Sequence, residues 1–233
     1  MLGVIGGMGP LATADFFRKL IDATPATRDE DHIPVLVHSV PQVPSRPAAI
    51  LRGGPSPLPA LLGARDRLLT AGATLLVMPC NTAHYWYDEL VAGCSVPFIH
   101  IVDAVAAQLP AARELGIIAT RATLQSRVFD DRLAQRGIAL TAPDDATYDA
   151  VVQPAIDLVK RGEPRKAGAL IEPVVAQMLD RGAAAVVLAC TELPIALDAT
   201  ASQLATRCID STDALARACV QHWFARSSAT AHL

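Results

Sequence analysis

Two short stretches, "MPCNTAH" at Met78–His84 and "LACTELP" at Leu188–Pro194, have the same construction. Each places a cysteine, Cys80 or Cys190, shortly after a run of aliphatic residues and directly before two polar residues. An aliphatic run that stops at polar residues is typical of a buried strand followed by a helix. The two stretches therefore predict that the chain builds one strand–turn–helix corner twice.

The sequence around the two corners repeats with a nearly constant offset. The cysteines are 110 residues apart, and "FIHIVDAVA" at Phe98–Ala106 resembles "CIDSTDALA" at Cys208–Ala216 at the same offset. Upstream, "GVIGG" at Gly3 matches "GIIAT" at Gly116 at an offset of 113. Three matched landmarks in the same order indicate an internal duplication into two similar halves.

Short aliphatic runs alternate with amphipathic helical stretches, which is typical of parallel strands in an α/β fold. The expected strands are residues 2–5, 34–40, 74–78, 97–101, 115–119, 183–188 and 208–209, with 138–140 a weaker candidate. We place residues 1–100 plus 209–233 in the N-terminal half and residues 101–208 in the C-terminal half. Because ligands of open parallel sheets bind at the carboxyl ends of the strands, both cysteines are expected in one interdomain cleft.

Composition limits the classes of function. The 233 residues are 52% hydrophobic and 18% charged with a formal charge of −3, so a compact chain without an electrostatic footprint for nucleic acid is expected. The longest uncharged stretch contains Pro79, Asn81 and His84, which does not suit a membrane helix. The first expected strand begins at residue 2, so we expect no secretory signal. The five cysteines lack paired spacing, which indicates reduced thiols in the cytoplasm. They also lack metal-binding spacing, so no bound metal is expected.

The two cysteine corners suggest acid/base chemistry. A thiol at a helix start meets backbone N–H groups and the positive end of the helix, which favour a pKa below the free value of about 8.5. Two such thiols facing one cleft suit the movement of a proton between the two faces of one carbon, because one removes it and the other returns it. The alternative for each is a small buried core thiol, the interpretation given to Cys94, Cys208 and Cys219.

The segments "GVIGGMGPLAT" at the start, "PCNTAH" around Cys80 and "ACTEL" around Cys190 resemble the aspartate/glutamate racemase family, especially its cofactor-independent aspartate racemases. The resemblance extends through nearly the whole chain. It implies two pseudo-symmetric flavodoxin-like domains with parallel sheets, a homodimer, and racemisation of aspartate or, alternatively, glutamate. It also implies that no pyridoxal phosphate is used and that Cys80 and Cys190 are the two bases. Related branches that racemise hydantoins or isomerise maleate remain alternatives.

The resemblance also implies substrate-binding residues. Arg46 and Lys160 match the cations that bind the side-chain carboxylate in the family, and Arg can do so with two parallel hydrogen bonds; exposed surface charges are the alternative. The other candidates are Met8, Asn81, Thr82, Thr123, Thr191 and Glu192. The amide, hydroxyl and backbone groups among them would donate to the α-carboxylate, unless the threonines only cap helices. Glu192 would bind the α-ammonium group or change the pKa of Cys190. Alternatively, it is only an acidic residue that interacts favourably with the positive end of the helix dipole.

Three rival interpretations remain. Gly7-Met8-Gly9 opens a match to the dinucleotide fingerprint, but the second expected strand ends in "HSVPQ" without the acidic residue that binds ribose. The glycines would otherwise let this loop approach the cleft. A two-lobed small-molecule binding protein would explain the duplication but not the paired thiols. His84 would assist Cys80 or only pack, and His100, aligned with Asp210, is expected to cap a helix.

Overall fold

The computed structural model describes residues 1–109, 111 and 114–230 of the chain. The strands are β1 (Leu2–Gly6), β2 (Val35–Ser39), β3 (Leu75–Val77), β4 (Glu114–Ala119), β5 (Ala139–Thr141), β6 (Val186–Ala189) and β7 (Cys208–Asp210). The α-helices are α1 (Pro10–Ala23), α2 (Arg46–Arg52), α3 (Leu58–Thr70), α4 (Tyr87–Val91), α5 (Ile101–Ala106), α6 (Arg121–Gln125), α7 (Val128–Ala134), α8 (Asp145–Thr147), α9 (Gln153–Lys160), α10 (Pro164–Asp180), α11 (Glu192–Ala199) and α12 (Ser211–Thr230). Single 3₁₀ segments are Asp29–Asp31, Thr82–Trp86 and Gln203–Arg207, and Tyr148–Val152 is a π-helical turn.

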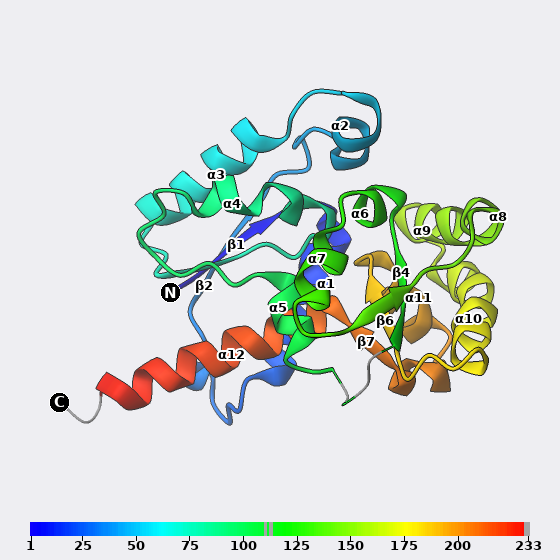
Figure 1. The fold of residues 1–233 in the computed structure, drawn as a ribbon. Coiled ribbons are helices and arrows are strands. Elements are labelled where there is room, and N and C mark those ends of the chain that lie inside the picture. Colours follow the sequence, from blue (N-terminus) through cyan, green and yellow to red (C-terminus); the bar gives the residue numbers. More distant parts are fainter. Residues whose placement is uncertain (110, 112–113, 231–233) are drawn as a thin grey trace.

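The strands form two parallel sheets, which confirms the expected α/β fold. One has the order β2-β1-β3 and the other the order β5-β4-β6-β7, and helices surround both (Figure 1). The pairing of β1 with β3 in the first sheet corresponds to the pairing of β4 with β6 in the second. The strand that precedes each cysteine is therefore the neighbour of the first strand in its half.

The strand expected at residues 97–101 is wrong. Phe98 forms only an isolated bridge to Leu76 of β3, and Ile101 already begins α5. Proline at position 97 has no N–H to donate, and the side chain of His100 accepts a hydrogen bond from the Val102 N–H at the helix start. The segment is therefore too short for a ladder before the helix begins.

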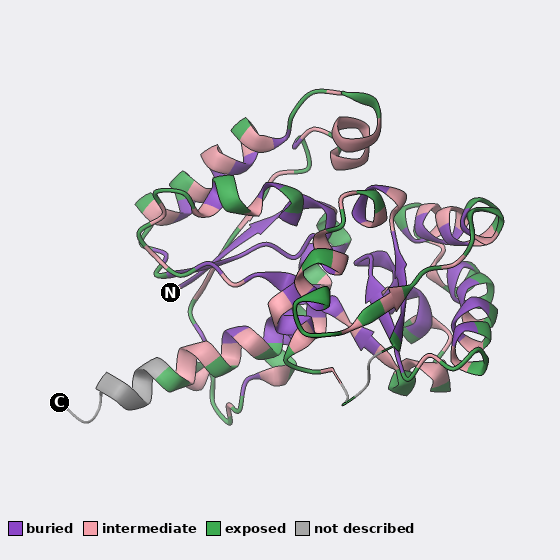
Figure 2. Ribbon diagram, viewed as in Figure 1, coloured by how far each residue is buried: buried purple, intermediate pink, exposed green. Residues whose placement is uncertain are grey.

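The cores are aliphatic, as the composition predicts. Every residue of β1, β3 and β6 is buried, and these strands lie inside the two lobes in Figure 2. One buried cluster combines residues of β1 and α5 with residues of β4, β6 and α12, so the two halves share apolar packing. Helix α12 follows β7 of the second sheet but packs against α1 and α5. The domain boundaries near residues 100 and 209 stay a prediction.

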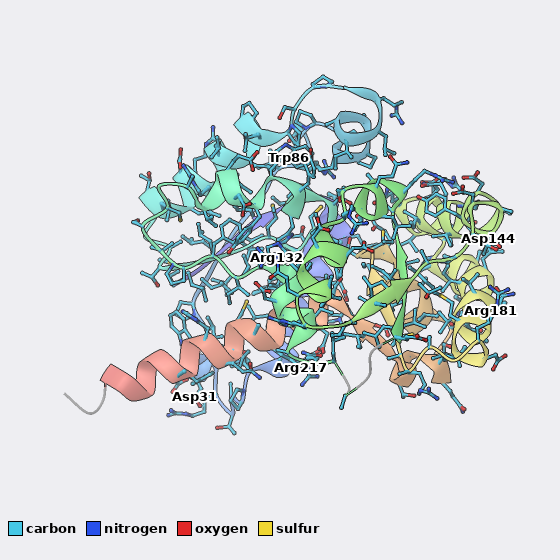
Figure 3. All side chains as sticks on the ribbon, in the orientation of Figure 1. Asp31, Trp86, Arg132, Asp144, Arg181 and Arg217 are labelled. Carbon is cyan, nitrogen blue, oxygen red and sulfur yellow. The ribbon has the colours of Figure 1, made fainter. Side chains whose placement is uncertain are left out.

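Polar contacts also connect helices and strands that lie around the two sheets. Arg132 of α7, labelled in Figure 3, donates a 2.8 Å hydrogen bond to Asp103 of α5, and its guanidinium lies 5.4 Å from the centre of the Tyr87 ring. On another side, the buried Lys19 of α1 forms 2.5 Å ion pairs with Asp15 and with Asp210 at the end of β7. The second contact connects α1, which follows β1 of the first sheet, to β7 of the second sheet.

Candidate active site

The two cysteines occupy corresponding places at the carboxyl ends of β3 and β6. Cys80 lies three residues beyond β3 and just before the 3₁₀ segment Thr82–Trp86, whereas Cys190 follows β6 directly and α11 begins at Glu192. Their exposed fractions are only 6% and 4%. All five cysteines of the chain are free thiols. Both corners thus have the predicted strand–turn–helix form, although the first one begins with a 3₁₀ turn.

One cavity of about 290 Å³ lies between the two corners. Nine of the ten residues singled out from the sequence line it: Met8, Arg46, Cys80, Asn81, Thr82, Lys160, Cys190, Thr191 and Glu192. The tenth, Thr123, is buried and does not line the cavity. Its hydroxyl lies 2.7 Å from the hydroxyl of Thr82, which does. Residues from both halves of the chain therefore meet around one small space, as the duplication predicts.

The surroundings of Cys80 raise the pKa of its thiol, mainly because burial disfavours the charged thiolate. The Arg46 guanidinium and the backbone N–H of Ala83 oppose this effect, and the charge of Glu192 adds to it. The expectation of a lowered pKa is therefore wrong for Cys80. The helix start does favour the thiolate, but desolvation outweighs it.

Cys190 has a different set of neighbours. Its Sγ donates a 3.1 Å hydrogen bond to Oε2 of Glu192, which also accepts a 3.1 Å bond from the Thr191 hydroxyl. Burial and the Glu192 carboxylate together raise the pKa of Cys190 well above its ordinary value, and the charge of Lys160 only partly opposes them. Here too the expectation of a lowered pKa is wrong. Glu192 thus contacts Cys190, which agrees with the tuning role among its proposed roles.

Each thiol has one cation on its side of the cavity. Arg46 lies at the start of α2, where its Nη1 donates 3.0 Å hydrogen bonds to the carbonyls of Val43 and Pro44, while its buried Nε has no partner among the described residues. Lys160 ends α9, is exposed, and forms no ion pair with another described residue. Both cations therefore retain donors for an anionic ligand.

The two histidines near this site act on the backbone. His84 Nδ1 lies 2.9 Å from the Cys80 carbonyl, and its Nε2 accepts a 3.2 Å hydrogen bond from Ile101 N–H. The ring therefore ties the Cys80 corner to the start of α5, and burial lowers its pKa to about 4. His100 caps α5, while Asp210 accepts from the N–H groups of Thr212 and Asp213 at the start of α12. The expectation that His100 caps a helix is confirmed, and the aligned Asp210 caps α12.

The loop after β1 requires a glycine at position 7. Gly7 has φ +92°, and a Cβ there would lie 2.3 Å from the Val40 nitrogen. Met8 and Gly9 line the cavity, so the loop closes one side of it. The second strand ends at Ser39 without an acidic residue, which leaves the dinucleotide interpretation without its ribose ligand.

Sequence reasoning missed several lining residues, of which Thr120 is the most polar. Its hydroxyl lies 3.1 Å from that of Thr82 and 2.9 Å from that of Thr123, so three hydroxyls meet across the two halves. Thr120 occupies the position of Gly7 in the repeat, directly after β4, and that correspondence was the available signal. The helix capping proposed for Thr82 and Thr191 is not observed, since neither side chain caps its helix.

A larger hollow of about 690 Å³ lies elsewhere, between α1, α11 and the start of α12. Its one thiol is Cys208, whose pKa burial raises to about 12, which makes it a poor acid/base group at neutral pH. Among the residues with described positions, no cluster of histidine, cysteine or acidic side chains is arranged to hold a metal ion. None of the described helices is long and apolar enough to cross a membrane.

The chain is similar to several known proteins. The family model described as Asp/Glu/Hydantoin racemase matches residues 5–219. The broad specificity amino-acid racemase RacX of Bacillus subtilis is 27% identical over 98% of this chain and 100% of its own length. The structure of Picrophilus torridus aspartate racemase has a TM-score of 0.85 and 31% identity, covering 95% of this chain and 93% of that one. Glutamate racemase of Francisella tularensis, solved with D-glutamate, shares the fold with a TM-score of 0.69 and 16% identity over 97% of this chain and 81% of that one.

Proposed function

The chain belongs to the Asp/Glu/hydantoin racemase family, and we propose that it interconverts the enantiomers of an acidic amino acid without a cofactor, aspartate before glutamate. The observation that carries this proposal is the cavity itself, because Cys80 and Cys190 come from different halves of the chain and line the same space. The name of the Picrophilus relative, an aspartate racemase, supports aspartate as the substrate.

In the proposed reaction one thiolate removes the α-proton and the opposite thiol supplies a new one. If Cys80 is the base, its sulfur takes the proton from one face of the α-carbon, and the electron pair stays on the carbon and the adjacent carboxylate. The Cys190 thiol then donates its proton to the other face and is left as the thiolate. No atom is gained or lost, and the reverse reaction exchanges the roles of the two sulfurs.

The charges around the cavity support an acidic substrate. The Arg46 guanidinium has a buried donor without a partner in the part of the chain that the structure describes, and Lys160 lines the same space, so a side-chain carboxylate would find two cations there. A bound anion would also offset the cost of keeping Arg46 partly buried. The family name covers hydantoins as well, and RacX is described as broad in specificity, so neutral amino acids and a hydantoin belong among the test compounds.

A racemisation assay tests this function. Purified, reduced protein is incubated separately with D- and L-aspartate, D- and L-glutamate, alanine and a 5-substituted hydantoin, with a chelator and without pyridoxal phosphate. We expect both enantiomers of aspartate to reach a racemic mixture. Failure with every acidic enantiomer, in protein that melts cooperatively, would contradict the proposal. Turnover of the hydantoin alone would place the chain among the hydantoin racemases of the family.

A homodimer is also part of the proposal. Leu11, Phe17 and Ile21 of α1 are large apolar side chains with exposed fractions of 52%, 39% and 43%, which a second copy would cover. Light scattering should give about twice the mass of 24.5 kDa, and a monomeric mass at micromolar concentration would contradict the dimer. A cytoplasmic location stays a prediction from the cysteine content.

A further inference from the structure

A single buried hydroxyl connects the two cysteine corners. Ser211 is the first residue of α12 and has no exposed surface. Its Oγ accepts a 2.9 Å hydrogen bond from Nδ2 of Asn81, the residue after Cys80. The same Oγ donates a 2.9 Å bond to the carbonyl of Leu188, two residues before Cys190. Ser211 does not line the cavity, so any effect on the substrate has to pass through a neighbour.

The position of Ser211 is fixed by the start of α12, which begins beside β7 and extends along α5 (Figure 1). Asp210 accepts 2.8 Å and 2.7 Å hydrogen bonds from the backbone and the hydroxyl of Thr212. The buried Lys19 binds both Asp210 and the Thr212 hydroxyl. The serine on the same turn is therefore held in place by charged and capping contacts that do not involve the cavity.

The count of protons sets the orientation of the Asn81 amide. A carbonyl oxygen carries no hydrogen, so the only proton of the Ser211 hydroxyl goes to Leu188. The serine oxygen can then only accept, which requires the NH₂ group of Asn81 on that side. The amide oxygen Oδ1 is consequently turned away from Ser211, and it is buried without a hydrogen-bond partner among the described residues.

An unpartnered buried amide oxygen in a residue that lines the cavity points to a ligand with N–H groups. Resting on the proposed function, we propose that Ser211 is a positioning residue that holds Asn81 with Oδ1 toward the substrate's α-ammonium group. This assigns Asn81 to the ammonium rather than to the α-carboxylate expected from the sequence. In the repeat, the matched residue of Ser211 is the apolar Ile101, whose backbone binds His84, so the arrangement is specific to one corner.

The test compares a ligand that has the ammonium with one that lacks it. Calorimetry measures the binding of racemic aspartate, which undergoes no net turnover, and of succinate, the same dicarboxylate without the amino group. We expect Ser211→Ala to weaken aspartate about ten-fold or more, the loss typical of a hydrogen bond to a charged group, with succinate affinity unchanged. Ser211→Thr, which keeps the hydroxyl, should restore aspartate binding.

Two controls separate positioning from general damage. Thr24→Val removes a buried hydroxyl that donates to the Leu20 carbonyl away from the cavity, and it should leave the aspartate-to-succinate ratio unchanged. In an Asn81→Ala background, Ser211→Ala should have no further effect on that ratio, because the two residues act through one contact. If Ser211→Ala does not fold, Ser211→Cys, a weaker donor and acceptor of similar size, gives the same comparison.

The outcomes distinguish this inference from the proposed function. Equal weakening of aspartate and succinate, or no change in either, would overturn the role of Ser211 while the unmodified protein still racemised aspartate. A protein that bound succinate but neither bound nor racemised aspartate would contradict the proposed function as well.

Discussion

The corner at Cys80 and the corner at Cys190 follow similar chain paths but have different neighbours. Cys80 lies beside the Arg46 cation, which favours its thiolate, whereas Cys190 donates a hydrogen bond to the Glu192 carboxylate, which favours its thiol. Burial raises the pKa of both thiols, and the Glu192 carboxylate bonded to Cys190 raises that thiol's pKa further. The two corners each supply a thiol, and the neighbouring residues that differ between them, Arg46, Glu192 and Lys160, change how far the pKa of each thiol is raised.

The largest expected effect comes from removing either thiol. Cys80→Ala and Cys190→Ala should each lower racemisation by a factor of about 10²–10⁴ or more, since one face of the carbon loses its acid/base group. Cys219→Ala, which removes an equally buried thiol outside the cavity, is the matched control for activity. Racemisation of both enantiomers at the normal rate in either single variant would make the two corners functionally unequal and refute the two-thiol mechanism.

The cations are expected to rank next. Arg46→Ala should reduce kcat/KM for aspartate by about ten- to a hundred-fold, as expected for the loss of a charge-assisted hydrogen bond. Lys160→Ala should have a smaller effect, because its side chain is exposed. The control Arg52→Ala removes an exposed arginine from the same helix as Arg46. Unchanged kinetics in both Arg46→Ala and Lys160→Ala would contradict a substrate-binding role and leave these residues as ordinary surface charges.

Glu192→Gln sharpens the difference between the corners. The amide oxygen can still accept a hydrogen bond from the Cys190 thiol, but the negative charge that raises the pKa of Cys190 is gone. The pKa of Cys190 should fall, so the limb of the pH–kcat profile that reports its ionisation should move to lower pH. Glu172→Gln, on α10 and bonded to Thr200, should leave the profile unchanged. If the limb stays in place in Glu192→Gln, Glu192 does not control the pKa of Cys190.

The last prediction concerns stability and His84, whose ring lies against the Cys80 carbonyl. Its pKa of about 4 lies below the unfolded value of about 6.5, so the unfolded chain takes up a proton that the folded chain does not. The free energy of unfolding should therefore decrease as the pH falls from about 6.5 to 4, by about 3 kcal/mol from this residue. Urea unfolding between pH 7 and 4.5 should show a weaker pH dependence in His84→Gln. Equal pH dependence in both proteins would show that this ring titrates normally.

The sequence predicted the features that depend on local pattern. The aliphatic runs located β1, β3, β4 and β6, and the repeated cysteine at the end of two of them located the cavity. The repeat also identified His100 and Asp210 as caps of corresponding helices. These predictions succeeded because aliphatic strand patterns and helix caps depend on residues that are neighbours in the chain.

The features that sequence reasoning missed depend on residues far apart in the chain. The pKa of each thiol is raised by tertiary burial, which a helix-start argument does not contain. Thr120 lines the cavity, whereas Thr123 is covered by Thr82 and does not. This difference depends on the packing of α6 against the Thr82 turn. Ser211 and Asn81 are 130 residues apart, and no local pattern predicts their contact.

The exchange of the α-proton in heavy water tests the two-thiol mechanism most directly. Cys80→Ser and Cys190→Ser are each incubated with D-aspartate and with L-aspartate, and the α-proton signal is followed by NMR. Each variant should lose racemisation but still exchange the α-proton of one enantiomer, and the two variants should select opposite enantiomers. Exchange of the same enantiomer in both variants, or full racemisation in either one, would contradict the placement of one thiol on each face of the carbon.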